Sequence, residues 1–239
     1  MRGSSSGSIF LAGGGDELQS RAVDELFLSA LPHKRVAYLP IALDSKKHPY
    51  DDCLRWLSGA FEAIGPVSIT LWPSLTGKTL ADLEPFDALY VGGGNTYALR
   101  QALREANFDQ VIQEFIQRGK TVYGGSAGAI VLGNSITPAS VGIEADINTV
   151  GLANLSGLQL LGRWSVHCHY HSVDDDELIR LSERGPIMAI PEHAGVHMHA
   201  GTFFVIGSSI AVFVTGTKSF HKPGTQISIT AGDLRGNQS

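Results

Sequence analysis

Apolar runs alternate with amphipathic segments along the first half of the chain. The apolar runs have the length of single buried strands, and they occupy residues 8–12, 35–42, 66–72, 86–91 and 120–123. A helix capped by Asp16, with Leu18, Ala22, Leu26 and the Leu28 side on its apolar stripe, follows the first run. Further helices are predicted over 50–64, 80–83, 96–104 and 108–117. This alternation predicts an α/β fold, in which one parallel sheet carries helices on both faces.

The second half of the chain predicts shorter elements. Glycines interrupt residues 135–161, which we interpret as a loop with short elements. Period-two alternation over 164–171 predicts a strand with His167, His169 and His171 on one face. A helix over 174–184 and a strand over 187–190 follow. The remainder predicts short antiparallel strands at 196–199, 202–206, 210–214 and 226–230.

The composition fits a single globular domain. A length of 239 residues with 43% hydrophobic and 17% charged residues allows one sizeable core, which we assign to residues 9–232. Residues 1–8 lack the apolar segment of a signal peptide, so they and residues 233–239 are expected to be a flexible leader and tail. The net charge of −5 argues against a nucleic-acid partner, and no apolar run reaches the roughly 20 residues of a membrane span. Two cysteines indicate a reducing compartment, and we expect a cytoplasmic protein.

Residues 121–132 combine a β-type run, a glycine turn and a second apolar run. Ser126 stands in the turn, with Gly124 two residues before it and Gly128 two residues after it. Small neighbours let the backbone bend sharply and lift the hydroxyl clear of the sheet, which is the geometry of a nucleophile elbow. The same pattern also suits a turn that only packs a helix against a strand.

A second glycine turn, Gly92–Gly94, follows the predicted strand 86–91. In a parallel sheet both turns lie beyond the carboxyl ends of strands, so they are expected to face one crevice. Backbone N–H groups of this turn and of Ala127 could stabilise an oxyanion. A phosphate-binding loop is the alternative, although the Lys-Ser/Thr of a P-loop is missing.

A serine hydroxyl needs a base, and the candidates are histidines. Two groups of histidines recur at every second position: His167, His169, His171, His197 and His199. Such His-x-His pairs could instead bind zinc in a metal-dependent hydrolase. Glu192, at the end of a predicted strand, could orient an imidazole, or it could be an ordinary solvated carboxylate.

Four motifs occur in an ordered set: Val91-Gly-Gly-Gly-Asn-Thr-Tyr97, Gly125-Ser-Ala-Gly-Ala129, His169-Tyr170 and Pro191-Glu192. Their order and spacing, from about Ile9 to Val214, resemble the dipeptidase E branch of serine peptidases, which also contains cyanophycinase. The resemblance implies a class I glutamine amidotransferase-like fold with a flavodoxin-like parallel sheet. It also implies hydrolysis of short peptides, or of a related amide, with no cofactor and no metal.

The resemblance carries roles for individual residues. Ser126 would be the nucleophile, His169 the base and Glu192 the orienting acid. The oxyanion donors that it implies are the N–H groups of Gly94 and Ala127. The substrate-contact positions are Gly93, Asn95 and Asp146, of which Asp146 is the nearest match to an aspartate after the elbow. The expected partner is a short peptide substrate, and the expected state is a monomer or homodimer.

The chain departs from this family after the proposed base. Dipeptidase E binds an N-terminal aspartate with an arginine shortly after the histidine, whereas this chain reads His171-Ser-Val-Asp-Asp-Asp-Glu177, with no arginine before Arg180. A carboxylate would repel an aspartyl side chain. If Asp174 or Asp175 lines the pocket, a basic or neutral residue would suit it better. Both could instead form the acidic first turn of a helix.

Two other functions are compatible with the sequence. One is a metal-dependent hydrolase built on the histidine pairs, and the other is a non-catalytic protein that binds a small molecule. A glutamine amidotransferase is disfavoured, because that chemistry uses a cysteine at the elbow where this chain has Ser126.

Overall fold

The computed structural model describes residues 7–228, so most of the expected leader and all of the expected tail lie outside the described residues. The strands are β1 Ser8–Ala12, β2 Arg35–Leu39, β3 Ser68–Leu71, β4 Ala88–Val91, β5 Thr121–Gly125, β6 Ser165–Cys168, β7 Ile187–Ile190, β8 Ala194–His199, β9 Thr202–Gly207, β10 Ile210–Val214, β11 Thr217–His221 and β12 Gln226–Ser228. The helices are α1 Arg21–Ala30, α2 Tyr50–Glu62, α3 Leu80–Leu83, α4 Thr96–Glu105, α5 Phe108–Gln117, α6 Ala127–Leu132 and α7 Asp175–Ser182. Short 3-10 turns cover Thr137–Ser140 and Ser172–Asp174.

The main sheet has the strand order β12-β9-β8-β1-β5-β4-β2-β3. Its β1, β5, β4, β2 and β3 pair in parallel, whereas β8, β9 and β12 continue the sheet as antiparallel strands. If β2 is counted as the first strand and β1 as the fifth, the parallel part β3-β2-β4-β5-β1 has the flavodoxin-like order 2-1-3-4-5. The α/β fold with C-terminal antiparallel strands is therefore confirmed.

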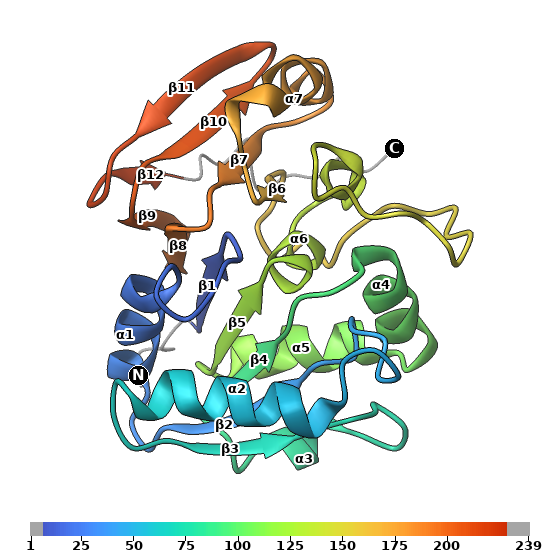
Figure 1. Ribbon diagram of the computed structural model, residues 1–239, viewed down its shortest axis with the longest axis vertical. Coiled ribbons are helices and arrows are strands. Elements are labelled where there is room, and N and C mark those ends of the chain that lie inside the picture. The colour runs from blue at the N-terminus through green and yellow to red at the C-terminus, as the bar shows by residue number, and fades with distance from the viewer. Residues whose placement is uncertain (1–6, 229–239) are drawn as a thin grey trace.

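A second sheet, which the sequence did not predict, has the order β11-β10-β7-β6. Together with α7 it lies at the opposite end of the molecule from β3 (Figure 1). Here β6 and β7 are parallel neighbours, so their carboxyl ends meet. The edge strand β11 was missed because its Thr-Lys-Ser-Phe-His sequence is mostly polar and no residue of it is fully buried.

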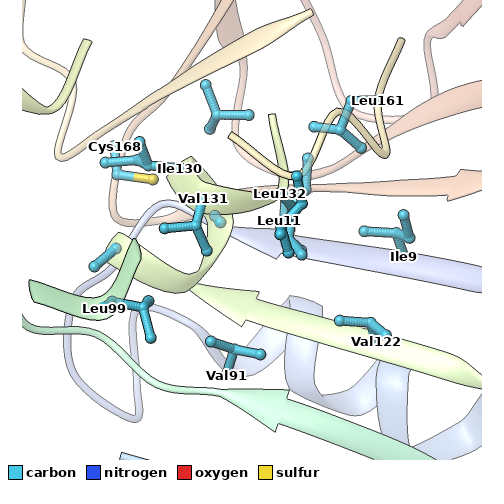
Figure 2. Close-up of a cluster of buried hydrophobic side chains, with 14 of the residues drawn as sticks. Ile9, Leu11, Val91, Leu99, Val122, Ile130, Val131, Leu132, Leu161 and Cys168 are labelled. Carbon is cyan, nitrogen blue, oxygen red and sulfur yellow. The ribbon is translucent and has the colours of Figure 1, made fainter. Parts of the chain in front are cut away.

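Alternate residues of the sheet enter two separate cores. Ile9 and Leu11 of β1 pack in the cluster that α4, α5 and α6 cover, which Figure 2 shows in part. Phe10 and Ala12 point to the other face, where α1 and α2 cover a ring-rich cluster. The strand pattern is apolar on both faces for this reason, as expected for a sheet between two helical layers.

Asp24 of α1 is a buried carboxylic acid beside the ring-rich cluster. Its oxygens accept hydrogen bonds from Ser20 Oγ at 2.8 Å and from Tyr123 Oη at 2.6 Å. Burial nevertheless raises the pKa of Asp24 to about 6, because the loss of hydration disfavours the charged form more than the two hydrogen bonds favour it.

We expect Asp24→Asn to change the pH dependence of stability. The unfolded chain releases the Asp24 proton near its ordinary pKa, whereas the folded chain holds it until about pH 6. The wild type therefore loses stability between these two values as the pH rises. The free energy of unfolding of the wild type, minus that of Asp24→Asn, should fall by up to about 3 kcal/mol between pH 4 and pH 7. Urea unfolding at several pH values would measure this difference. A difference that stays constant with pH would contradict the raised pKa.

Two local predictions at the N-terminal end are wrong. β1 begins at Ser8, which pairs with Thr121 and so does not belong to a leader. α1 begins at Arg21, and Asp16 caps the preceding turn by accepting the N–H groups of Leu18 and Gln19. Of the predicted stripe, Leu28 is buried, whereas Ala22 and Leu26 are exposed. Leu18 is 74% exposed, and the residues of α1 that are buried are Val23, Asp24, Phe27 and Leu28.

The predicted strand over 164–171 is also wrong in its second half. β6 ends at Cys168, and His169 has a φ of +53°, which breaks the alternation. His167, His169 and His171 therefore do not share a face. The predicted strand 226–230 begins correctly as β12, and its last two residues lie outside the described range. Among residues 7–228, no helix is both long and apolar enough to cross a bilayer.

Candidate active site

The turn between β5 and α6 holds Ser126 at φ +49° and ψ −113°. The two flanking glycines are required by close backbone approaches. A Cβ on Gly124 would lie 2.6 Å from Ala129 N, and a Cβ on Gly128 would lie 2.1 Å from Val91 O. A non-glycine residue at such a φ is uncommon and stores strain, as in nucleophile elbows.

Ser126 Oγ lies 2.8 Å from His169 Nε2, and His169 Nδ1 lies 3.2 Å from Glu192 Oε1. His169 directly follows β6, and Glu192 lies two residues after β7. Because these strands are parallel neighbours, the two side chains leave the second sheet at the same edge. A hydrogen bond from His169 lowers the pKa of Glu192, with a further bond from Gln19, so the carboxylate is ionised at neutral pH.

Gln19, which the sequence analysis did not single out, supports the acid. Its Nε2 donates to Glu192 Oε2 at 2.6 Å, while its Oε1 accepts the N–H of Asp16 at 2.8 Å. The Asp16 turn that precedes α1 therefore holds Gln19 in place. The carboxylate of Glu192 is bound on both oxygens, one to the imidazole and one to the amide.

Gly14, which follows β1, makes room for the imidazole. It has a φ of +112°, and a Cβ here would lie 2.1 Å from His169 Cε1. The neighbouring Gly13 O accepts the N–H of His169 at 2.9 Å. The Gly13–Gly15 run was visible in the sequence only as the end of a strand, and nothing local linked it to a histidine more than 150 residues away.

The Gly92–Gly94 turn faces the elbow, as predicted. A Cβ on Gly93 would lie 3.3 Å from Ser126 Cβ. Gly94 has a φ of +133° and touches the backbone of Ala42, so its peptide takes an orientation that other residues adopt rarely. Ala127 opens α6, where the first amides of a helix have no partner within it. Gly94 lines the same two cavities as Ser126, and Ala127 directly follows Ser126 in the chain.

Two cavities meet at Ser126. The larger, of about 500 Å³, is lined by residues of the β1, β4 and β5 ends and by α2 and the loop before it. The smaller, of about 230 Å³, is lined by residues that follow α6 and by the end of β6. Gly94, Ser126 and His169 line both. The hydroxyl and the imidazole are thus reached from two sides.

Asp146 lines the smaller cavity together with Ser126. Its Oδ2 accepts the N–H of Thr96 at 2.8 Å, which fixes the carboxylate near the start of α4. Asn95 is the cap of α4, since its side-chain oxygen accepts the N–H of Ala98 at 3.0 Å. Gly93 lines the larger cavity, whereas Asn95 lines neither of the two.

Asp174 and Asp175 are not in the pocket, and their prediction as substrate contacts is wrong. Asp174 is buried and accepts hydrogen bonds from His167 Nε2 at 3.2 Å and from His171 N at 2.9 Å. Asp175 binds Tyr170 Oη at 2.9 Å and Lys218 Nζ at 2.6 Å, beside the second sheet. Neither carboxylate lines a cavity next to Ser126. Both instead bind residues around the N-terminal end of α7.

The histidine pairs do not converge. His167 is buried, with Nδ1 against Pro138 O at 3.1 Å, and burial lowers its pKa. His197 and His199 lie on β8, where both contact Ser8 Oγ. Across residues 7–228, no three His, Cys, Asp or Glu side chains are grouped so as to hold a metal ion. The geometry therefore gives no support to the metal-dependent alternative.

A serine on a strand-to-helix elbow, bonded to an imidazole that is itself bonded to a carboxylate, defines the class of α/β proteins with a Ser-His-acid arrangement. The sequence pattern of peptidase family S51 matches residues 9–206, and the chain belongs to this family. An uncharacterized peptidase of Listeria monocytogenes is 26% identical over 198 residues, which cover 82% of this chain and 89% of that protein. Peptidase E of Haemophilus influenzae is 32% identical over 111 residues, which cover 46% of this chain and 49% of that protein.

Two solved structures share the fold. A candidate peptidase E protein from Listeria monocytogenes EGD-e has a TM-score of 0.65 at 24% identity, and covers 84% of this chain and 98% of its own. A peptidase from an acI-B1 Actinobacterium has a TM-score of 0.69 at 16% identity, and covers 95% of this chain and 98% of its own. At these identities the likeness establishes the fold, and residue roles depend on the geometry given above.

Proposed function

We propose that this peptidase is a serine exopeptidase that hydrolyses short peptides, dipeptides above all, through an acyl-enzyme on Ser126. The observation that carries the proposal is the continuous chain of contacts from Ser126 Oγ through His169 to Glu192. A hydroxyl becomes a nucleophile when a base within hydrogen-bond reach can take its proton, and 2.8 Å meets that requirement.

The reaction has two steps. His169 Nε2 accepts the proton as Ser126 Oγ attacks the scissile carbonyl, and the Glu192 carboxylate stabilises the imidazolium. The carbonyl oxygen gains negative charge near the N–H groups of Gly94 and Ala127. His169 then gives the proton to the leaving amine, and the C–N bond breaks. Water then attacks the ester of the acyl-enzyme while His169 accepts its proton. The carboxylic acid is released, and His169 returns the proton to Ser126 Oγ.

The shape of the site supports a small substrate. The two cavities that meet at Ser126 have volumes of about 500 and 230 Å³. Pockets of several hundred Å³ hold ligands of small-molecule size. One residue on each side of the scissile bond would fill the available space, which favours a dipeptide over a folded protein or a long chain.

A diphenyl phosphonate that mimics an aminoacyl group should label Ser126 alone. We expect mass spectrometry of a digest to show one adduct, on the peptide that contains Ser126, and hydrolysis of aminoacyl coumarin amides to fall in proportion to labelling. Treatment with a chelator should leave the activity unchanged. Full activity without an adduct, or activity lost to the chelator and restored by zinc, would favour the metal-dependent alternative. No adduct and no turnover would favour a non-catalytic binding protein.

A further inference from the structure

The larger cavity next to Ser126 contains a tyrosine hydroxyl without a protein partner. Tyr38 of β2 is only 3% exposed, and it lines this cavity. Within residues 7–228 the Tyr38 hydroxyl has no hydrogen-bond partner, and its oxygen is not among the buried unbonded side-chain atoms, so it is open to the cavity. Burial raises the pKa of Tyr38, so the phenol stays neutral and can both donate and accept. A ligand that enters the cavity can supply the missing partner.

The position of Tyr38 relates this hydroxyl to the reacting atoms. A Cβ on Gly92 would lie 3.2 Å from the Tyr38 ring and 3.4 Å from its hydroxyl. The next residue of the turn, Gly93, faces Ser126. The cavity therefore extends from the nucleophile, along the Gly92–Gly94 turn, to the Tyr38 hydroxyl.

The walls of this cavity are mostly rings and aliphatic groups. Tyr90 and Tyr123 stack with centroids 4.4 Å apart, and Tyr38 meets Tyr90 edge to face at 5.4 Å. Leu43 and Trp56 line it as well. Aromatic walls of this kind accept a flat ring in stacked or edge-to-face contact.

The charged groups of the cavity stand at its mouth. Lys47, His48 and Asp52 line it and are exposed, and Asp52 is paired with Arg55. An aspartyl side chain placed among the buried tyrosine rings, below the exposed Lys47, would lose its hydration, which is costly. A large neutral side chain with one polar group at its tip fits both the walls and the free hydroxyl.

We propose that this cavity binds the side chain of the acyl-donating residue, and that it selects tyrosine, whose phenol hydrogen-bonds to Tyr38. The proposal rests on the proposed function, because it assigns the acyl residue relative to Ser126. In the proposed reaction the oxygen of the scissile carbonyl faces the Gly94 and Ala127 amides. The side chain of the acyl-donating residue is attached to the Cα next to that carbonyl. It therefore reaches the cavity beside the Gly92–Gly94 turn.

The test compares coumarin amides of tyrosine, phenylalanine, leucine and aspartate, in which only the acyl residue varies. We expect tyrosine to exceed phenylalanine in kcat/KM by about 2- to 10-fold, as one hydrogen bond allows, and aspartate to be the poorest substrate. Tyr38→Phe should bring the tyrosine-to-phenylalanine ratio close to one. Tyr170→Phe removes a phenol hydroxyl that binds Asp175 outside the cavity, and it should leave that ratio as in the wild type.

A second variant and a binding measurement test the proposal even if Tyr38→Phe does not fold. Leu43→Trp should narrow the cavity and lower kcat/KM for the tyrosine amide more than for an alanine amide. Calorimetry should show tighter binding of L-tyrosinamide than of L-phenylalaninamide. Turnover with equal preference for tyrosine and phenylalanine, or selectivity that follows only the leaving residue of dipeptides, would overturn this inference and leave the serine mechanism standing. If no amide is hydrolysed and no phosphonate adduct forms, the proposed function fails, and calorimetry still decides whether the cavity selects a phenol.

Discussion

Ser126→Ala is expected to lower kcat/KM by about 10⁴-fold or more, while the protein stays folded. The hydroxyl lies 2.8 Å from His169 Nε2, so its removal takes away the nucleophile and leaves only oxyanion stabilisation and binding. Alanine is no worse suited than serine to the φ of +49° at this turn, and within the described part of the chain the hydroxyl bonds to His169 alone. The melting temperature should therefore change by no more than about 2 °C.

Kinetics with a dipeptide and with a coumarin amide would measure this effect, and thermal unfolding would establish that the variant is folded. Calorimetry on the variant with an intact dipeptide separates binding from chemistry, because binding should survive. A variant that retains more than a few per cent of wild-type kcat/KM would exclude Ser126 as the nucleophile.

Gly14→Ala is expected to lower kcat/KM by at least about 10²-fold, although Gly14 contributes no reacting atom. Its Cβ would lie 2.1 Å from His169 Cε1, and the imidazole would have to move away from Ser126. A displacement of about 1 Å in a catalytic group is enough for a loss of this size. Gly14 also lines the larger cavity, so KM can change as well, and the loss of kcat is the part that reports on the displaced imidazole.

Gly77→Ala is the matched control. Gly77 also has a positive φ, of +71°, but a Cβ there meets nothing within 4 Å. Both variants carry the backbone strain of alanine in the left-handed region, and only Gly14→Ala crowds the imidazole. Gly14→Ala should therefore lose much more activity than Gly77→Ala, and thermal unfolding should show that both variants are folded. Equal kcat/KM in both variants would show that His169 does not need the space beside Gly14.

Local sequence patterns predicted several elements with the bounds that the structure shows. The helix over 108–117, the short helix over 80–83 and the strands over 187–190 and 210–214 are examples. The buried residues Phe108, Ile112 and Phe115 recur at the helical period, whereas the strand over 187–190 is a short apolar run that is buried at every position. The α1 region failed because Leu18 and Leu26 are apolar but exposed, while the buried face includes the polar Asp24. Composition alone does not reveal which apolar residues a neighbouring layer will cover.

The elbow could be read from the sequence because its cause is local. Gly124 and Gly128 are needed because the backbone of Ala129 and that of Val91 come too close to leave room for a Cβ. Their spacing around Ser126 is visible in the sequence. The motif order also pointed to His169 and Glu192, through the resemblance to a family. The roles of Gln19 and Gly14 had no such signal, since both act on groups more than 150 residues away.

By itself, the sequence determined the α/β class, the parallel sheet of the first half and the sharp turn at Ser126, because hydrophobic period and glycine spacing act over short distances. Tertiary structure alone decided that β6 and β7 form a second sheet, that His169 leaves it at a φ of +53°, and that Asp174 and Asp175 fasten α7 away from the pocket. It also decided that Tyr38 ends in a cavity with a free hydroxyl. These features depend on which surfaces pack together, and no local pattern encodes that choice.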